Sequence, residues 1–249
     1  MASTPSWSAK PSCGRPIPAP NLRGCSPEAV ANAAATVLFD FDGTLVRGDC
    51  AAAWLRIQLR RDPLRRLAAG LSFPFLAPGF AWWRSAWVPA SFYTWLATVG
   101  RTHEALAEAR EDFLRDCARR RDELLIAPAV LRLRAHLDAG QPVVIVTGAE
   151  ASLARELWRA LGQPEVPVVG SSVREAFGGW IGQEHTVGPR KIAALAREGI
   201  HPPFAAVYSD SARDLPLLCE TACPVLVRPD ARSLARVNKR LRGAFETIL

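Results

Sequence analysis

The chain alternates between short, uninterrupted apolar runs and longer segments in which apolar residues recur every three or four positions. Five runs have the length of buried strands in a parallel sheet: residues 36–40, 142–147, 166–169, 205–209 and 224–227. Three segments between them have the spacing of amphipathic helices: residues 128–139, 152–161 and 192–196. Strands that alternate with helices predict an α/β fold built on a doubly wound parallel sheet.

The stretch between the first and second runs has a different pattern. Residues 50–122 contain no strand-like run, and residues 51–61 and 102–119 have helical spacing. Because ligands of α/β proteins bind beyond the carboxyl ends of the strands, we expect this insertion to form a helical cap over the site. The catalytic core then comprises residues 35–49 and 123–249.

Part of the predicted cap, residues 67–99, is rich in aromatic and apolar side chains. Residues 67–83 carry no charge, and a cluster of arginines precedes them. This combination is typical of a segment that inserts into one leaflet of an anionic membrane. The apolar run is shorter than the ~20 residues needed to cross a bilayer, and we expect Pro74 and Pro78 to break a straight helix. The alternative is an aromatic core inside the cap.

Composition and charge narrow the classes of function. The 249 residues are 49% hydrophobic and 22% charged, which predicts a folded chain. Residues 1–34, rich in Ser, Pro and Ala, are expected to form a disordered tail.

The net charge of +7 favours an anionic partner such as a phosphate ester or an acidic lipid. Nucleic acid is not expected, because the aromatic residues do not alternate with basic ones and no recognition motif is present.

The strongest local signal is the motif Asp40-Phe-Asp-Gly-Thr44, directly after the first apolar run. Two carboxylates two positions apart at a strand tip can share one metal ion while performing different chemical steps. Gly43 allows the chain to turn sharply there. Taken alone, the motif also fits an ordinary Asp-Gly turn with solvated acids.

Three further elements follow strands or open helices in a fixed order. Thr147 and Gly148 end the second run, where a hydroxyl and backbone amides can face an anion. Lys191 lies in the first turn of a predicted helix; since the helix dipole disfavours a cation there, a phosphate partner would explain its placement. Asp210 and Asp214 follow the fourth run. Together the four elements predict a site for a phosphate group at one edge of the sheet.

The order DFDGTL, IVTG, Lys191 and YSDSARD resembles the haloacid dehalogenase superfamily of phosphotransferases, over residues 36 to 235, and the insertion resembles its type 1 cap. More narrowly, the chain resembles phosphatidylglycerophosphatase C and the phosphoserine-phosphatase-like hydrolases. Four segments carry this narrower resemblance: residues 61–66, 100–104, 177–180 and 209–218. The chain departs from the pattern in its N-terminal tail and in a Gly-Pro-Arg-Lys context for Lys191, where the family form is Gly-His-Glu-Lys.

The resemblance implies a chemistry for the acidic residues. Asp40 would be the nucleophile that forms an aspartyl phosphate, and Asp42 the general acid and base. Mg²⁺ would bind the Asp40 carboxylate, the Asp42 main-chain carbonyl and Asp210.

It implies supporting roles for the remaining residues as well. Thr147, the Gly148 amide and Lys191 would hold the transferred phosphoryl group. Asp214 would orient either Lys191 or the metal shell. Asp49 would contact substrate, or else cap the first helix of the insertion.

The expected function is therefore a Mg²⁺-dependent phosphomonoester hydrolase. The preferred substrate is phosphatidylglycerophosphate, converted to phosphatidylglycerol at the cytoplasmic face of the inner cell membrane. The alternative is a soluble small-molecule phosphatase of the phosphoserine type, in the cytoplasm. A catalytically inactive membrane adaptor is disfavoured because every expected catalytic position is filled. Nothing in the sequence indicates the oligomeric state.

Overall fold

The structure, a computed structural model, describes residues 35–81 and 86–249. The predicted tail, residues 1–34, lies outside the described residues, as do Trp82, Trp83 and Arg84 of the aromatic stretch.

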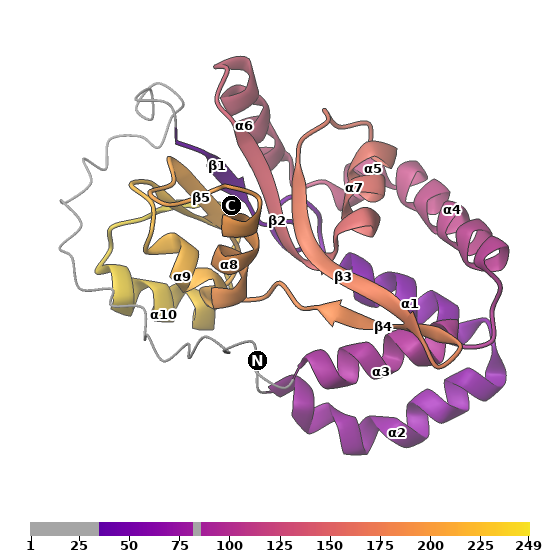
Figure 1. The fold of residues 1–249 in the computed structure, drawn as a ribbon. Helices are drawn as coiled ribbons and strands as arrows, with labels where there is room; N and C mark the ends of the chain where they lie inside the picture. Colours follow the sequence, from indigo (N-terminus) through magenta and orange to yellow (C-terminus); the bar gives the residue numbers. More distant parts are fainter. Residues whose placement is uncertain (1–34, 82–85) are drawn as a thin grey trace, which may run out of the picture.

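A seven-stranded sheet forms the centre of the molecule, with strand order β4-β3-β2-β1-β5-β6-β7 (Figure 1). The strands are β1 (Val37–Phe39), β2 (Val143–Glu150), β3 (Val168–Ala176), β4 (Gly179–Glu184), β5 (Ala206–Ser209), β6 (Pro224–Val227) and β7 (Glu246–Ile248). All neighbouring pairs are parallel except β3 and β4, which pair antiparallel. The predicted α/β fold with a doubly wound sheet is confirmed, with an antiparallel edge strand added.

Helices cover both faces of this sheet. Val37 and Phe39 pack into a core with α6 (Ala127–Asp138) and α7 (Ala151–Ala160). Leu38, between them, points to the opposite core, formed with α8 (Pro189–Arg197), α9 (Leu215–Leu218) and α10 (Ala231–Leu241). The strand order reverses at β1: β2 and β3 lie on one side of it, and β5, β6 and β7 lie on the other. The crevice at the carboxyl end of β1 is therefore the topological switch point, where folds of this kind bind ligands.

The segment between β1 and β2 is helical, as expected. Before α6 it contains α1 (Cys50–Arg60), α2 (Pro63–Ala81), α3 (Trp87–Thr98), α4 (His103–Arg119) and the short α5 (Arg121–Leu124). Asp49 caps α1, since its Oδ1 accepts a hydrogen bond from the Ala52 amide at 2.8 Å. Thr102 caps α4 in the same way, since its Oγ1 accepts a hydrogen bond from the Ala105 amide at 3.2 Å.

One expectation about this segment is wrong. Pro74 and Pro78 lie inside α2 and do not end it. Each proline removes one hydrogen bond to the preceding turn but leaves the neighbouring bonds of the helix in place. As a result α2 continues as one helix and curves along its length (Figure 1).

A hairpin that the sequence patterns did not predict joins the sheet to the helical insertion. Beyond Val169, β3 continues and turns back as β4, whose residues pack along α3 (Figure 1). The Trp180 amide donates to Thr98 Oγ1 at 2.8 Å, and the Gly182 amide donates to Ser91 Oγ at 3.0 Å. These contacts attach α3 of the cap to the sheet, in addition to the two places where the chain enters and leaves the cap.

No helix within residues 35–81 and 86–249 is both long enough and apolar enough to cross a membrane.

Candidate active site

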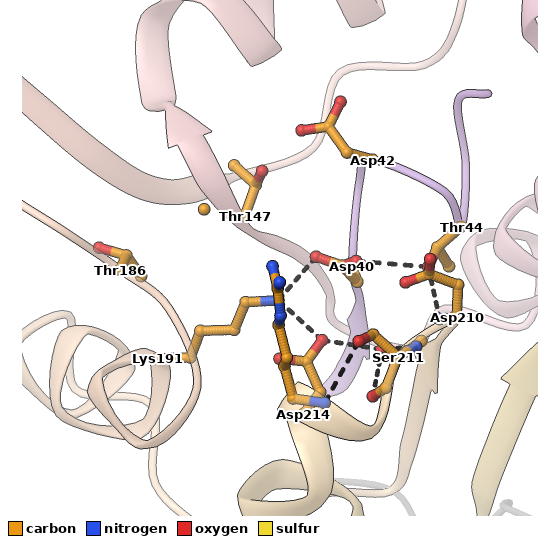
Figure 2. A network of polar contacts seen from close by, with 12 residues as sticks. Asp40, Asp42, Thr44, Thr147, Thr186, Lys191, Asp210, Ser211 and Asp214 are labelled. Atoms are coloured by element: carbon orange, nitrogen blue, oxygen red, sulfur yellow. Dashed lines mark hydrogen bonds and ion pairs between the residues drawn. The ribbon is translucent and has the colours of Figure 1, made fainter. Parts of the chain in front are cut away.

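Asp40 follows β1 directly and is nearly buried at the switch point. Its amide donates to the Tyr208 carbonyl of β5 at 2.9 Å, which fixes the backbone at the strand tip. Lys191 Nζ lies 2.6 Å from Asp40 Oδ1 and 2.8 Å from Asp214 Oδ2, so one ammonium group bridges two carboxylates (Figure 2). Burial raises the pKa of Asp40 to about 6, although Lys191 acts to lower it.

Lys191 itself is buried in the first turn of α8. Burial alone would lower the pKa of this ammonium group, but the charges of Asp214 and Asp40 raise the pKa above its ordinary value. The cation is therefore fixed in its charged state. The sequence suggested a phosphate partner for Lys191; the structure adds two carboxylates that hold it at the strand tips.

Asp214 is buried at the end of a 3₁₀ turn, Ala212–Asp214. Besides its contact with Lys191, Asp214 Oδ2 accepts a hydrogen bond from Ser209 Oγ at 2.8 Å. Of the two roles expected for Asp214, the structure contains the contact that orients Lys191. Ser209 was not among the predicted site residues, although it stands inside the same YSDSARD motif.

The Asp42 carboxylate stands apart from this network, as Figure 2 shows. Its Oδ1 accepts a hydrogen bond from the Cys50 amide at 2.8 Å, and the Cys50 thiol donates to Oδ2 at 3.6 Å. These contacts hold Asp42 at the N-terminus of α1. Burial, followed by the charge of Asp49, raises the pKa of Asp42 to about 7, while the hydrogen bonds from Cys50 act to lower it.

Asp210 follows β5 and lies against the turn that holds Asp42. Thr44 connects the two strand tips, since its hydroxyl accepts from the Asp210 amide at 3.0 Å and contacts Asp40 Oδ2 at 3.4 Å. Burial, then the charges of Asp40 and Asp214, raise the pKa of Asp210 to about 7. Thr44 was also missed as a site residue, although it belongs to the first motif.

Gly43 permits the close approach of Asp210. Its φ of +80° favours glycine, and a Cβ atom there would lie 2.3 Å from Asp210 Oδ2. We expect Gly43→Ala to displace this carboxylate, to lower turnover at least about a hundredfold and to destabilise the fold by about 1–3 kcal/mol. Steady-state kinetics and urea unfolding measure the two effects.

Gly140→Ala is the matched control for this substitution. Gly140 has a φ of +71° and nothing within 4 Å of the added Cβ, so it isolates the backbone strain. Gly140→Ala should lose stability but keep its turnover. If the two variants retained the same activity, Asp210 would have no part in the site.

Thr147 and Gly148 line the same cavity as Asp40. They fall within β2, whose pairing with β3 shifts register between Val146 and Glu150. Thr147 Oγ1 accepts a hydrogen bond from the Ala149 amide at 3.0 Å, which leaves its O–H free to donate to an anion.

A cavity of about 1120 Å³ separates these residues from the helical insertion. Asp49 lines it but uses its carboxylate to cap α1, which is the second of its two expected roles. The cap side combines apolar residues with arginines that the sequence analysis did not identify as site residues. They include Leu55, Arg56, Leu59, Arg60, Arg66, Phe73 and Tyr93. Only the position of the insertion over the strand tips could have indicated them.

The acidic residues around Gly43 fit a hard divalent cation. Asp40 and Asp210 offer carboxylate oxygens, and the close approach of Asp210 to Gly43 brings it beside the backbone of Asp42. Within the described ranges, no three or more His, Cys, Asp or Glu side chains converge as a metal-ligand group. The carboxylates of Asp40 and Asp210 are the side-chain donors at this place, and the main-chain carbonyl of Asp42 is the third ligand that the resemblance implies.

Comparisons with known proteins find relatives of this chain. The Mycobacterium leprae (strain TN) protein ML2424 is 33% identical over 227 residues, which cover 86% of this chain and 73% of the relative. Phosphoserine phosphatase SerB1 of Mycobacterium tuberculosis (strain ATCC 25618 / H37Rv) is 38% identical over 108 residues, covering 41% of this chain and only 35% of that protein.

A structure of a protein of unknown function from Bordetella pertussis Tohama I has the same fold. It has a TM-score of 0.70 and 24% identity, over 88% of this chain and 99% of the other. The sequence profile of the haloacid dehalogenase-like hydrolases matches residues 37–218, the span that carries every residue of the cluster around Asp40. The chain therefore belongs to the haloacid dehalogenase-like hydrolase family.

Proposed function

We propose that the protein hydrolyses phosphate monoesters through an aspartyl-phosphate intermediate on Asp40. The observation that carries the proposal is that Asp40 lines the cavity with its carboxylate held 2.6 Å from a buried lysine. A carboxylate in this position can attack an electrophilic phosphorus atom, and Lys191 supplies positive charge for the anionic group that approaches it.

The reaction proceeds in two displacements. A carboxylate oxygen of Asp40 forms a bond to phosphorus while the ester P–O bond breaks, and Asp42 gives its proton to the departing alcohol oxygen. Water then attacks phosphorus, Asp42 takes a proton from it, and the bond between Asp40 and phosphorus breaks to release phosphate. The Asp42 carboxylate lines the cavity next to Asp40, which is consistent with this role.

Other residues bind the phosphoryl oxygens. The free O–H of Thr147, the amide of Gly148 and the ammonium group of Lys191 are the donors that we assign to this task. Mg²⁺, held by Asp40, Asp210 and the Asp42 carbonyl, would neutralise charge on the phosphate and carboxylates.

For the substrate, we propose a lipid phosphomonoester, with phosphatidylglycerophosphate as the first candidate. The cavity of about 1120 Å³ exceeds what a small phosphate ester fills, and its cap side offers both apolar surface and arginines. A second candidate is a small ester of the phosphoserine type, supported by the 38% identity to phosphoserine phosphatase SerB1 over 108 residues.

Phosphate release measures both parts of the proposal. We expect turnover with Mg²⁺, loss of at least about a hundredfold after removal of the metal with EDTA, and recovery when Mg²⁺ is added back. Phosphatidylglycerophosphate in detergent micelles, phosphoserine and a nucleoside monophosphate are compared at equal concentration in the same detergent. Preference for the lipid supports the first candidate and preference for phosphoserine the second. Turnover that is unaffected by EDTA would contradict the metal assignment.

A further inference from the structure

The arginines at the end of α1 and the start of α2 divide into two groups. Arg61 pairs with Asp112 at 3.4 Å and Arg65 pairs with Asp62 at 3.0 Å, so both have an acidic partner. The other three line the cavity and form no ion pair with any residue that the structure describes. They are Arg56, Arg60 and Arg66. The arginines that lack an acidic partner are thus the ones that border the cavity.

The cap provides little negative charge near these three side chains. The helices α1, α2 and α3 contain no Asp or Glu. The acids nearest in the sequence already have contacts: Asp49 caps α1, and Asp62 accepts a hydrogen bond from the Leu64 amide at 2.9 Å and pairs with Arg65. A cavity wall that carries cations of this kind attracts an anionic group from solution.

These arginines lie away from the residues assigned to the reacting phosphate. α1 begins beside Asp42, whose Oδ1 accepts a hydrogen bond from the Cys50 amide at 2.8 Å. Since an α-helix rises about 1.5 Å per residue, Arg56 is roughly 9 Å and Arg60 roughly 15 Å along the axis from Cys50. Arg66 lies in the first turn of α2, which packs against α1. The unpaired charges therefore lie beyond the reach of a phosphate held at Asp40.

The wall beside these charges is apolar. Leu55 and Leu59, one helical turn apart on α1, line the cavity next to Arg56 and Arg60, and Phe73 of α2 lines it as well. A ligand that fills the cavity from Asp40 to the arginines can therefore have an apolar linker between two charged ends.

We propose that the substrate carries a second anionic group, a phosphate or a phosphodiester, and that Arg56, Arg60 and Arg66 bind it while the reacting phosphate lies at Asp40. The inference rests on the proposed hydrolysis of phosphate monoesters and adds the chemical class of the ester. Arginine suits this role because its guanidinium group donates two parallel hydrogen bonds to phosphate oxygens. A free second phosphate and the phosphodiester of a lipid headgroup offer the same chemistry here.

Three soluble esters test the proposal on the full chain with Mg²⁺. Hexyl phosphate has no second anion, hexane-1,6-diyl bisphosphate has a free second phosphate, and the monomethyl ester of that bisphosphate has a phosphodiester instead. At least one of the two doubly anionic esters should exceed hexyl phosphate in kcat/KM by about tenfold or more, mainly through a lower KM. Preference for the diester indicates a lipid headgroup, and preference for the bisphosphate indicates a free second phosphate.

Substitutions assign this preference to the cavity arginines. Arg56→Gln and Arg60→Gln should each lower the ratio of the two kcat/KM values about threefold or more. The matched control is Arg61→Gln, which removes the same charge from the end of the same segment but pairs with Asp112. It should keep the ratio of the unmodified protein. High salt should also reduce the ratio, because exposed charges are screened.

Binding of non-hydrolysable analogues separates this proposal from the proposed hydrolysis. In calorimetry, hexane-1,6-diyl bisphosphonate should bind at least about tenfold more tightly than hexyl phosphonate, and Arg56→Gln combined with Arg60→Gln should remove most of that difference. Equal kcat/KM for all three esters together with equal binding of the two phosphonates would overturn the second-anion site and leave the hydrolysis intact. Tighter binding of the bisphosphonate without phosphate release from any ester would support the site and contradict the hydrolysis.

Discussion

Replacement of Asp40 by asparagine should abolish turnover, with a fall in kcat of about 10⁴-fold or more. An amide has no anionic oxygen with which to attack phosphorus, so the first displacement cannot occur. The fold should remain, because the asparagine side chain has the shape of the original one and Asp214 still pairs with Lys191 at 2.8 Å. Phosphate release and urea unfolding, measured on the same preparation, separate these two effects.

Acid quenching during turnover gives a more direct readout of the same substitution. The unmodified protein should retain covalent phosphate that hydroxylamine releases, as expected of an acyl phosphate, and Asp40→Asn should retain none. Asp138→Asn, at an exposed position on α6, is the control and should behave like the unmodified protein. Turnover above about one per cent in Asp40→Asn would rule out Asp40 as the nucleophile.

The sequence predicted the strand tips of this site well, for a physical reason. Strands buried on both faces appear as uninterrupted apolar runs, and the carboxyl ends of parallel strands meet at one edge. Asp40 and Thr147 end two such runs and Asp210 follows a third, and the structure places all three around one cavity. Lys191 comes from a helix, but its position in the first turn indicated an anionic partner, because the helix dipole disfavours a cation there.

The parts that escaped prediction have weak or ambiguous patterns. β4 contains two glycines and is partly exposed, and it pairs antiparallel at an edge, so it has no buried apolar run. Thr44 contacts the Asp210 amide across two strand tips, and Ser209 contacts Asp214 within the loop that follows β5; short hydroxyl side chains make both contacts, and the sequence pattern does not reveal either of them. For α2, the apolar sequence fits a buried helix, but the structure exposes Leu64, Leu67, Leu71 and Phe75. An apolar run alone does not indicate whether its side chains are buried or exposed.

Replacement of Lys191 by methionine should damage both stability and catalysis. Lys191 is the cation that lies between the carboxylates of Asp40 and Asp214, and all three side chains are buried or nearly so. Its removal leaves two buried charges without compensation, which costs about 3–5 kcal/mol of unfolding free energy. Turnover should fall about 10²-fold or more, because an ammonium donor to the phosphoryl group is lost at the same time.

The stability of Lys191→Met should also acquire a pH dependence with a definite sign. Lys191 lowers the pKa of Asp40, which burial has raised from 3.8 to about 6, so the pKa rises further in the variant. A carboxyl group whose pKa is higher in the folded than in the unfolded state binds more protons when folded. Stability is therefore lost as the pH rises from about 4 through the folded pKa. Urea unfolding at about pH 5 and pH 8 should show the larger deficit at pH 8.

Two further variants test whether the stability deficit of Lys191→Met comes from the uncompensated carboxylates. Lys239→Met, at an exposed lysine on α10, should unfold like the original protein at both pH values. Adding Asp214→Asn to Lys191→Met removes one of the two uncompensated charges, so it should restore part of the stability but none of the turnover. If Lys191→Met were instead as stable as Lys239→Met at both pH values, the ammonium group would not be balancing buried charge. Its role would then be confined to the substrate phosphate, as the first turn of α8 suggested from sequence alone.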